Sequence, residues 1–373
     1  MSQEKLAILE MLREGKITTE EAMALLKQVE GDGEPARGSA SESFCGEERE
    51  TGIPHIQFGM DFSWINDLKN AVEETARNLI PDGWPLGLRQ ETFTASTFIG
   101  DGACSLVFEG KNAPVKLEAH SGDHVEVEAY YKRKSQWDPH LSLAVENGII
   151  SLRCDDNALS SLGISVRVPE TAQIGTILLK SKNAPITVHR VEAKKIELFT
   201  KNNVIKASHV KGESLYCETK NSAISLADVI MQKVNAQTSN SKISLDNVEA
   251  VHANLETSNS KIDVEDSDIV ELIASTSNSP LRFERLGYRK DRRDRSIEAT
   301  TSNGQISIRI PNQDMKCKVR ASTTVTGVFT EIGDLEYEVN EKNYVEAQAR
   351  GYEEAESKLR LNLQTTNLGV YIK

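Results

Sequence analysis

Hydrophobic and polar positions recur every 19 residues through the middle of the chain. Each repeat carries an Asn, with Ser or Thr two positions before it and Ile or Leu three positions after it. The repeated residues are Asn183, Asn202, Asn221, Asn240, Asn259 and Asn278, and Asn303 restores the motif after a longer interval. On both sides of the Asn, apolar residues occupy alternate positions, as in half-buried strands. A fixed period of this length predicts a solenoid of stacked coils.

Each coil is predicted to hold two strands with the Asn at the corner between them. Nineteen residues are too few for a helix as well as two strands, so we expect a mainly β fold, a parallel β-solenoid. Asn can bond to its equivalents in the coils above and below, and it tolerates the left-handed conformation of a tight corner. We therefore interpret the Asn column as a structural ladder, and the Ser/Thr column beside it as a ladder of hydroxyl groups.

The array is expected to span residues 85–373. Residues 171–311 hold the regular repeats, and residues 85–170 form irregular coils with a looser motif and longer excursions. Residues 312–373 leave the pattern in a β-rich excursion and rejoin it in a terminal coil around Asn367. A repeat that departs and returns in this way suggests that the excursion helps to close the far end of the array.

Helical spacing replaces strand spacing before the array. Residues 1–30 form a predicted helical hairpin, in which Gly15 ends the first helix and Thr18 with Glu21 caps the second. Because so short a segment buries little on its own, its apolar stripe is a candidate docking face. The face comprises Leu6, Leu9, Leu12, Leu25, Leu26 and Val29.

Two further segments join this hairpin to the array. Residues 31–52 are rich in Gly, Ser and acidic residues, a composition typical of a flexible linker. Residues 53–84 contain an amphipathic helix over about 61–80 that we expect to cap the first coil of the solenoid. A role at a membrane surface is the alternative for this helix, although its polar face mixes acidic and basic residues.

Composition narrows the classes of function. A net charge of −12 argues against a general nucleic-acid binder, which would be basic. The five cysteines are widely spread and include no CxxC pair, which predicts a reducing compartment rather than a disulfide framework. Neither a secretory signal pattern nor an apolar run long enough to cross a bilayer is visible. We expect a cytoplasmic protein that can associate with the membrane, and surface exposure would require non-classical export.

One basic segment interrupts the repeat. The interval from Asn278 to Asn303 is 25 residues, so six residues are inserted there. The basic side chains around the insertion are Arg282, Arg285, Arg289, Lys290, Arg292, Arg293 and Arg295. Insertions in repeat proteins often carry the binding feature, which makes this segment a candidate site for phospholipid heads, a wall polymer or an acidic partner. The alternative is a solvated loop whose charges pair with one another.

Patterns for catalysis are weak. Polysaccharide chemistry on a β-solenoid needs carboxylates clustered on one face. The column seven residues after the Asn instead mixes charges, with Arg190, His209, Asp228, Asn247, Asp266 and Arg285. His120 and His124 flank a Ser-Gly-Asp turn that lacks a third metal ligand. We therefore predict a protein that is not an enzyme and has no metal and no cofactor.

Two parts of the chain resemble a known family. The stretch from Lys5 to Leu26, with its central Glu14-Gly15-Lys16-Ile17-Thr18 turn, resembles the short helical, SHOCT-like domain of YvlB-like and LiaX-like bacterial proteins. The Thr-Ser-Asn repeats resemble the C-terminal β-repeat domain of those proteins. That type of domain is named after adhesins.

This resemblance implies a non-enzymatic binding or regulatory protein linked to cell-envelope stress in Gram-positive bacteria. The helical module would dock a protein partner of that response, or a ligand of the membrane or wall, and the β-domain would be the scaffold. A structural adhesin or self-associating scaffold is the alternative function. A polysaccharide-active enzyme is the third.

Overall fold

The computed structural model describes residues 90–99, 104–134, 138–155, 157–287, 294–310 and 315–373. The chain divides into two compact units, residues 1–82 and 83–373, and every described residue lies in the second. The predicted helical hairpin, the acidic linker and the amphipathic helix lie outside the described residues. The docking face proposed on the hairpin lies outside them as well.

All regular elements in the described residues are strands, and hydrogen bonds join them into one continuous sheet. The strands are β1 (Gln90–Phe98), β2 (Cys104–Gly110), β3 (Asn112–His120), β4 (His124–Arg133), β5 (Ser142–Glu146), β6 (Ile149–Arg153), β7 (Leu159–Pro169), β8 (Ile174–Ser181), β9 (Ile186–His189), β10 (Glu192–Phe199), β11 (Ile205–Glu218), β12 (Ile224–Gln237), β13 (Ile243–Glu256), β14 (Ile262–Glu265), β15 (Asp268–Thr276), β16 (Leu281–Glu284), β17 (Arg295–Thr301), β18 (Ile306–Arg309), β19 (Lys316–Ser322), β20 (Val328–Thr330), β21 (Leu335–Glu341), β22 (Tyr344–Ala349), β23 (Lys358–Thr365) and β24 (Val370–Ile372).

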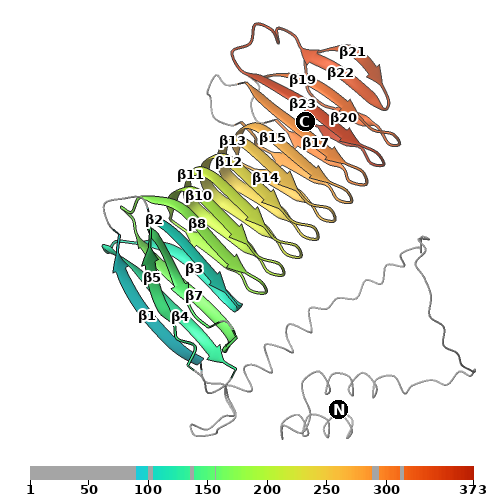
Figure 1. Cartoon of the computed structure of the whole chain (residues 1–373). Helices are drawn as coiled ribbons and strands as arrows, with labels where there is room; N and C mark the ends of the chain where they lie inside the picture. The colour runs from blue at the N-terminus through green and yellow to red at the C-terminus, as the bar shows by residue number, and fades with distance from the viewer. Residues whose placement is uncertain (1–89, 100–103, 135–137, 156, 288–293, 311–314) are drawn as a thin grey trace, which may run out of the picture. The chain divides into compact units, whose positions relative to one another are not determined.

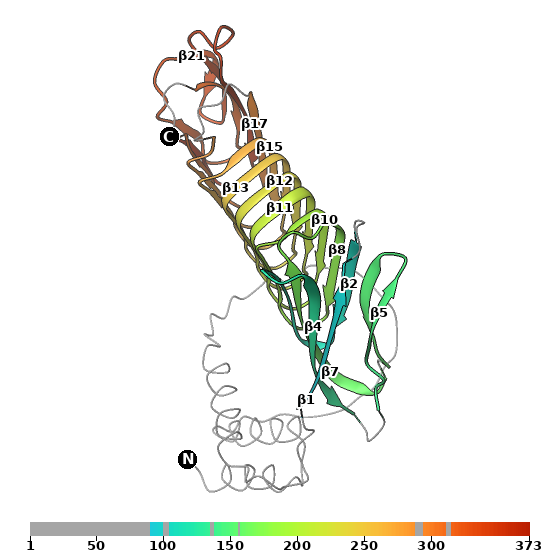
Figure 2. The same ribbon diagram turned by 90° about the vertical axis from the view of Figure 1, so that its left-hand side faces the viewer.

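From β8 to β18 the chain winds through coils whose strands pair in parallel. Each residue lies opposite its equivalent in the next coil, as Ile205, Ile224 and Ile243 do across β11, β12 and β13. Figure 1 and Figure 2 both show these strands side by side in chain order. The predicted parallel β-solenoid is confirmed.

Each regular coil contains three paired segments, not the two that the sequence predicted. Pairing between β11 and β12 is interrupted at His209 and again at Glu213. His209 has a φ of 53°, and its backbone bend lets Ala207 and Val210 both face the interior although they are three positions apart. Buried and exposed positions therefore do not alternate strictly at this point. A prediction based on alternation could not find the extra corner.

The left-handed corner lies seven residues after the Asn and not at the Asn itself. The residues with positive φ in the regular coils are Arg190, His209, Asp228, Asn247, Asp266 and Arg285. None of the seven repeat Asn residues is among them, so the predicted left-handed role of the Asn is wrong. Asn, Asp and His suit the corner because they adopt positive φ more easily than most side chains, whereas Arg there is unusual.

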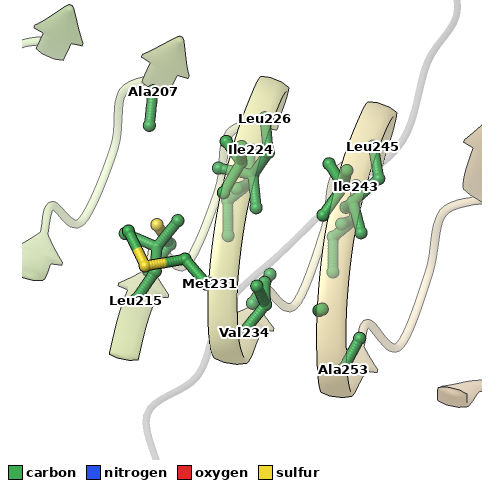
Figure 3. Packing of buried hydrophobic residues seen from close by; sticks show 14 of the residues in the cluster. Ala207, Leu215, Ile224, Leu226, Met231, Val234, Ile243, Leu245 and Ala253 are labelled. Atoms are coloured by element: carbon green, nitrogen blue, oxygen red, sulfur yellow. The ribbon is translucent and has the colours of Figure 1, made fainter. Parts of the chain in front are cut away.

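Aliphatic side chains fill the interior of each coil and stack on those of the next. Figure 3 shows Ile224 and Leu226 beside Ile243 and Leu245, with Val234 closing the layer from the facing segment. All five are at most 1% exposed. Burying such a side chain contributes about 1.5–3 kcal/mol before entropy is counted. Each coil is thus stabilised mainly by its two neighbours.

Coils at both ends of the array are stacked out of chain order. β23 lies between β17 and β19, and β24 lies between β18 and β20. At the other end, β2 and β3 separate β8 and β9 from β6 and β7. Antiparallel strands complete each end, with β4 and β1 beyond β7 and with β22 and β21 beyond β19. The C-terminal coil is therefore inserted beneath the excursion that precedes it.

The Asn side chains form one hydrogen-bonded ladder along the array. From Asn202 to Asn303, each Nδ2 donates to the Oδ1 of the Asn in the preceding coil over 2.7–2.8 Å. The ladder extends into both rearranged ends, because Asn183 donates to Asn112 and Asn367 donates to Asn303. An amide suits such a column because it carries a donor and an acceptor together.

The threonines of the neighbouring column do not bond to one another. Each hydroxyl donates instead to a backbone carbonyl of the preceding coil, one residue after its Asn. Thr219, Thr238 and Thr257 make this bond over 3.1 Å to residues 203, 222 and 241. These threonines are at most 3% exposed, so the bond satisfies a hydroxyl group buried beside the core. The predicted ladder of hydroxyl groups is corrected accordingly.

A buried carboxylate also links neighbouring coils. The side chain of Asp263 is 7% exposed, and its Oδ2 lies 2.8 Å from Lys242 Nζ and 2.9 Å from Lys261 Nζ. Burial alone would raise the pKa of Asp263, but hydrogen bonds from the two lysines outweigh it and hold the pKa below its usual value. The ionised form is therefore the one that the fold stabilises.

Replacing one ladder Asn tests how much the amide column contributes. Asn240 makes a ladder bond on each side, whereas Asn367 makes one. We expect Asn240→Ala to lower the free energy of unfolding by roughly 1–2 kcal/mol and Asn367→Ala by about half as much. Chemical denaturation of the two variants measures the difference. Equal losses would show that the amides act independently of the ladder.

Asp263 predicts a pH dependence of stability. Because its pKa is lowered in the folded state, its contribution is present above the unfolded pKa of about 3.9 and is lost as the pH falls through the folded value. We expect Asp263→Asn to cost about 1–2 kcal/mol at pH 7 and progressively less below pH ~4. Denaturation at a series of pH values measures this. Asp246→Asn, at an exposed position, is the matched control and should leave the free energy of unfolding at pH 7 unchanged.

Candidate functional site

The described arginines of the basic insertion are paired with acids. Arg282 lies 2.9 Å from Glu284, and Arg285 makes hydrogen bonds of 2.5 and 2.6 Å to Asp266. The hydrogen bond from Arg285 lowers the pKa of Asp266. The remaining predicted residues of this patch, Arg289, Lys290, Arg292 and Arg293, lie outside the described residues. For the part that the structure describes, the charges satisfy one another.

Arg295, the last residue of the predicted patch, has a structural position. It begins β17 directly after the insertion, and its side chain is 2% exposed. Its Nε and Nη2 lie 2.9 and 2.7 Å from Asp268 Oδ1 at the start of β15. Removing either member of such a pair would leave a buried charge, which costs about 3–5 kcal/mol. Arg295 therefore anchors the end of the insertion and is not exposed to a ligand.

The left-handed column does not assemble a carboxylate pair. Asp228 Oδ1 accepts a 2.6 Å bond from Asn247, and Asp228 Oδ2 lies 3.6 Å from His209 Nε2. Asp266 is bound by Arg285. Each carboxylate of the column is engaged by a basic or amide side chain of a neighbouring coil, so the arrangement holds coils together.

Two other sequence candidates also have structural contacts. His120 Nε2 lies 2.8 Å from the His124 carbonyl, and the Gly122 amide donates to His120 Nδ1. Both ring nitrogens are thus used within the turn. In the described part of the chain, no group of three His, Cys, Asp or Glu side chains could hold a metal ion.

Three of the described cysteines have buried, poorly reactive thiols. Cys104, Cys217 and Cys317 are free, and burial raises the pKa of Cys104 and Cys217 and raises that of Cys317 to about 11. Raised values keep a thiol protonated and poorly nucleophilic. Within the described residues, no helix is long and apolar enough to cross a membrane.

The N-terminal end of the array presents an open strand edge that sequence reasoning did not single out. β1 pairs along its whole length with β4, in one uninterrupted register, and no other strand of the described residues pairs with it. Its sequence, QETFTASTF, contains a single charge. Thr92, Thr94, Ser96 and Phe98 are exposed. Such an edge is a template for another strand.

A polar cavity of about 620 Å³ lies at the other end, on the outer face of β15, β17, β23 and β19. Lys318 and Arg360 are direct register partners on β19 and β23, and Arg320 and Lys358 flank them. Cations were not expected to meet here, because the two strands are neighbours only through the out-of-order stacking of the last coil.

Comparisons with known proteins match two family models to the chain. The family model described as Toastrack DUF4097 matches residues 103–362, and a SHOCT-like domain model matches residues 3–34. No curated protein matches the chain.

Among solved structures, the chain is similar to a protein of Parabacteroides merdae named a "putative adhesin". The identity is 10% and the TM-score 0.43, and the match covers 76% of this chain and 97% of that one. It is also similar to a "putative lipid binding protein" of Parabacteroides distasonis, with 13% identity, a TM-score of 0.39 and coverage of 76% and 97%. Because the Toastrack model spans most of the described array, this chain belongs to the Toastrack DUF4097 family.

Proposed function

We propose that this protein is a non-enzymatic, adhesin-like scaffold that self-associates through the edge of β1. The observation that supports the proposal best is the unprotected edge itself, nine residues long with one charge. The rigid stack of coils behind it supplies length and a fixed orientation, which are what solenoid scaffolds contribute. Of the functions that the sequence predicts, this proposal corresponds to the alternative, a structural adhesin or self-associating scaffold.

The sequence of β1 is complementary to itself. In an antiparallel pair of two β1 strands centred on Thr94, Thr94 faces Thr94 and Thr92 faces Ser96 of the second copy. Phe93 then faces Ala95, and the charged Glu91 faces Thr97 and not another acid. Cross-strand Thr and Ser pairs are favourable, and no like charges meet.

The opposite end of the array is protected against such pairing. The edge strand β21 has the sequence LEYEVNE, which carries Glu336, Glu338 and Glu341, and its register shifts between Tyr337 and Val339. Charged side chains and bulges are the usual means by which proteins block an edge. Pairing of β1 with β1 of a second copy uses the same edge in both copies, so this contact closes a two-fold dimer and not an open fibre.

Charge substitutions on β1 test this dimer. We expect Thr92→Lys/Thr94→Lys/Ser96→Lys to weaken it about tenfold or more, because three pairs of like charges would face one another. The triple Glu variant at the same positions should behave in the same way. An equimolar mixture of the Lys and Glu variants should restore the dimer, since each pair then joins opposite charges. Sedimentation velocity over a concentration series measures all three samples.

A matched control uses the protected edge. Tyr337→Lys/Asn340→Lys on β21 should leave the association constant unchanged. A full-length protein that stays monomeric at high concentration, or a dimer that is indifferent to the β1 substitutions, would rule out the β1 dimer.

A second function is favoured by the SHOCT-like match over residues 3–34. We propose that this helical module docks a protein partner of the cell-envelope stress response, while the β-array remains the scaffold. The protein would then reside in the cytoplasm and reach the membrane through that partner. A short helical pair with an apolar stripe needs such a surface, because it buries little by itself.

Deleting the module tests this second function. We expect the full-length protein to move from the soluble to the membrane fraction when cells receive a cell-wall antibiotic, and the variant lacking residues 1–50 to remain soluble. Deletion of residues 31–50 alone, which keeps the module, is the control and should still move. A full-length protein that never changes fraction contradicts the stress role.

A further inference from the structure

We propose that the cavity beside β19 and β23 binds a phosphate group through Lys318 and Arg360. The site lies at the opposite end of the array from β1, so the inference is independent of the edge pairing proposed above. Asp294 and Arg295, at the end of the basic insertion, line the cavity, but the proposed ligand contacts come from β19 and β23.

Two adjacent strands bring like charges together here. Lys316 lies opposite Lys358, and Lys318 lies opposite Arg360, in the parallel register of β19 and β23. Like charges directly opposite each other in a sheet are destabilising. Some cations elsewhere in the array bond to acids of the neighbouring coil, as Arg285 does to Asp266, whereas the exposed Lys182, Lys201 and Lys220 occupy equivalent positions in successive coils. The pair on β19 and β23 differs because it lines a cavity, in a protein whose net charge is −12.

The nearest acids are engaged by other partners. Glu346 accepts hydrogen bonds from Arg320 at 2.8 Å and from Tyr344 at 2.7 Å, one on each carboxylate oxygen. These bonds, with the charges of Arg320 and Lys318, lower the pKa of Glu346 and keep it ionised. The negative charge of Glu346 therefore acts on Lys318 through space, without a hydrogen bond or ion pair between them.

Lys358 and the remaining acids of the cavity lie near partners other than Lys318 and Arg360. Lys358 Nζ donates to the Glu353 carbonyl over 2.8 Å and lies 3.9 Å from the Glu353 carboxylate. Glu271 lies 2.7 Å from His252. Asp294 immediately precedes Arg295, whose register partner is Leu359, so Asp294 lies toward Lys358.

Lys318 and Arg360 are the two cations left over. In the described residues, neither has a hydrogen bond or an ion pair with an acid. On the same face of β17, Ser296 lies opposite Arg360, and Glu298 lies opposite Asn362 one step further along. The backbones of Lys318 and Arg360 are therefore about one strand spacing apart, roughly 4.8 Å, and the next strand places the neutral Ser296 beside Arg360.

This pair suits a phosphate better than a carboxylate. The guanidinium of Arg360 can donate two parallel hydrogen bonds to two oxygens of a tetrahedral anion, and the ammonium of Lys318 can reach a third. Two positive charges without a hydrogen bond or ion pair to an acid suit a phosphate monoester, which carries close to two negative charges at neutral pH. The ligand is thus a phosphate group on a small molecule or polymer, or on a lipid head, and the cavity volume of about 620 Å³ admits more than the group itself.

Calorimetric titration of the full-length protein with glycerol 3-phosphate at low ionic strength tests the proposal. We expect saturable binding with one site per chain, weakened about tenfold or more by Lys318→Gln and by Arg360→Gln, because each removes a charge-assisted hydrogen bond. Lys206→Gln on the exposed face of β11 is the matched control and should leave binding unchanged. Without ligand, Lys318→Gln should be at least as stable as the parent, since a repulsive pair is removed.

A second arm distinguishes the source of the phosphate. Flotation with phosphatidylcholine vesicles, with and without phosphatidylglycerol, measures binding to a lipid head. Vesicle binding that needs phosphatidylglycerol and is lost in the same two variants supports the site with a lipid source. Binding of glycerol 3-phosphate alone supports it with a soluble or polymeric source. Absence of binding in both arms, or binding that the two variants leave unchanged, overturns the proposal.

Discussion

The constraint on which the structure depends is that parallel coils stack in register, so every side chain lies against its own equivalent. The members of such a column must therefore be able to bond to one another or pack against one another. Asn satisfies this requirement because its amide donates on one side and accepts on the other, and the ladder from Asn112 to Asn367 uses both groups. Aliphatic columns such as Ile205, Ile224 and Ile243 satisfy it by packing. Identical charges cannot bond to one another, so Arg285 and Asp266 carry opposite charges at equivalent positions, whereas Lys182, Lys201 and Lys220 repeat one charge only where their side chains are exposed.

The same constraint explains where polar residues hold coils together. Asp263 lies between two lysines, Asp266 is bound by Arg285, and Asp228 lies between His209 and Asn247. In each of these contacts a carboxylate is paired with a basic or amide side chain that lies beside it. The facing cations of β19 and β23 have no such partner, since no acid of the described residues forms an ion pair with Lys318 or Arg360. A pair of cations that lines a cavity without an acid partner is a reason to assign it a ligand and not a structural role.

Much of the fold follows from the sequence, because the repeat encodes contacts between nearest neighbours. The period, the parallel pairing and the buried aliphatic columns are all properties of adjacent coils. The order of coils at the ends is not encoded in this way. Asn367 matches the template, but nothing in the template says that its coil lies beneath residues that precede it in the chain. The site at Lys318 and Arg360 depends on that order, as does the open edge of β1, and neither could be predicted from the repeat.

The ends of the array also decide how it can associate. A regular solenoid would expose an identical coil face at each end and could stack into fibres without limit. Here antiparallel strands interrupt the repeat at both ends, with β1 and β5 at one end and β21 at the other, although β20 still pairs in parallel with β24. β21 adds three acids and a bulge, whereas β1 remains nearly uncharged and regular. Pairing of β1 with its equivalent in a second copy occupies that edge in both copies, so this contact forms a closed pair, and it is an irregular end, and not the repeats, that determines it.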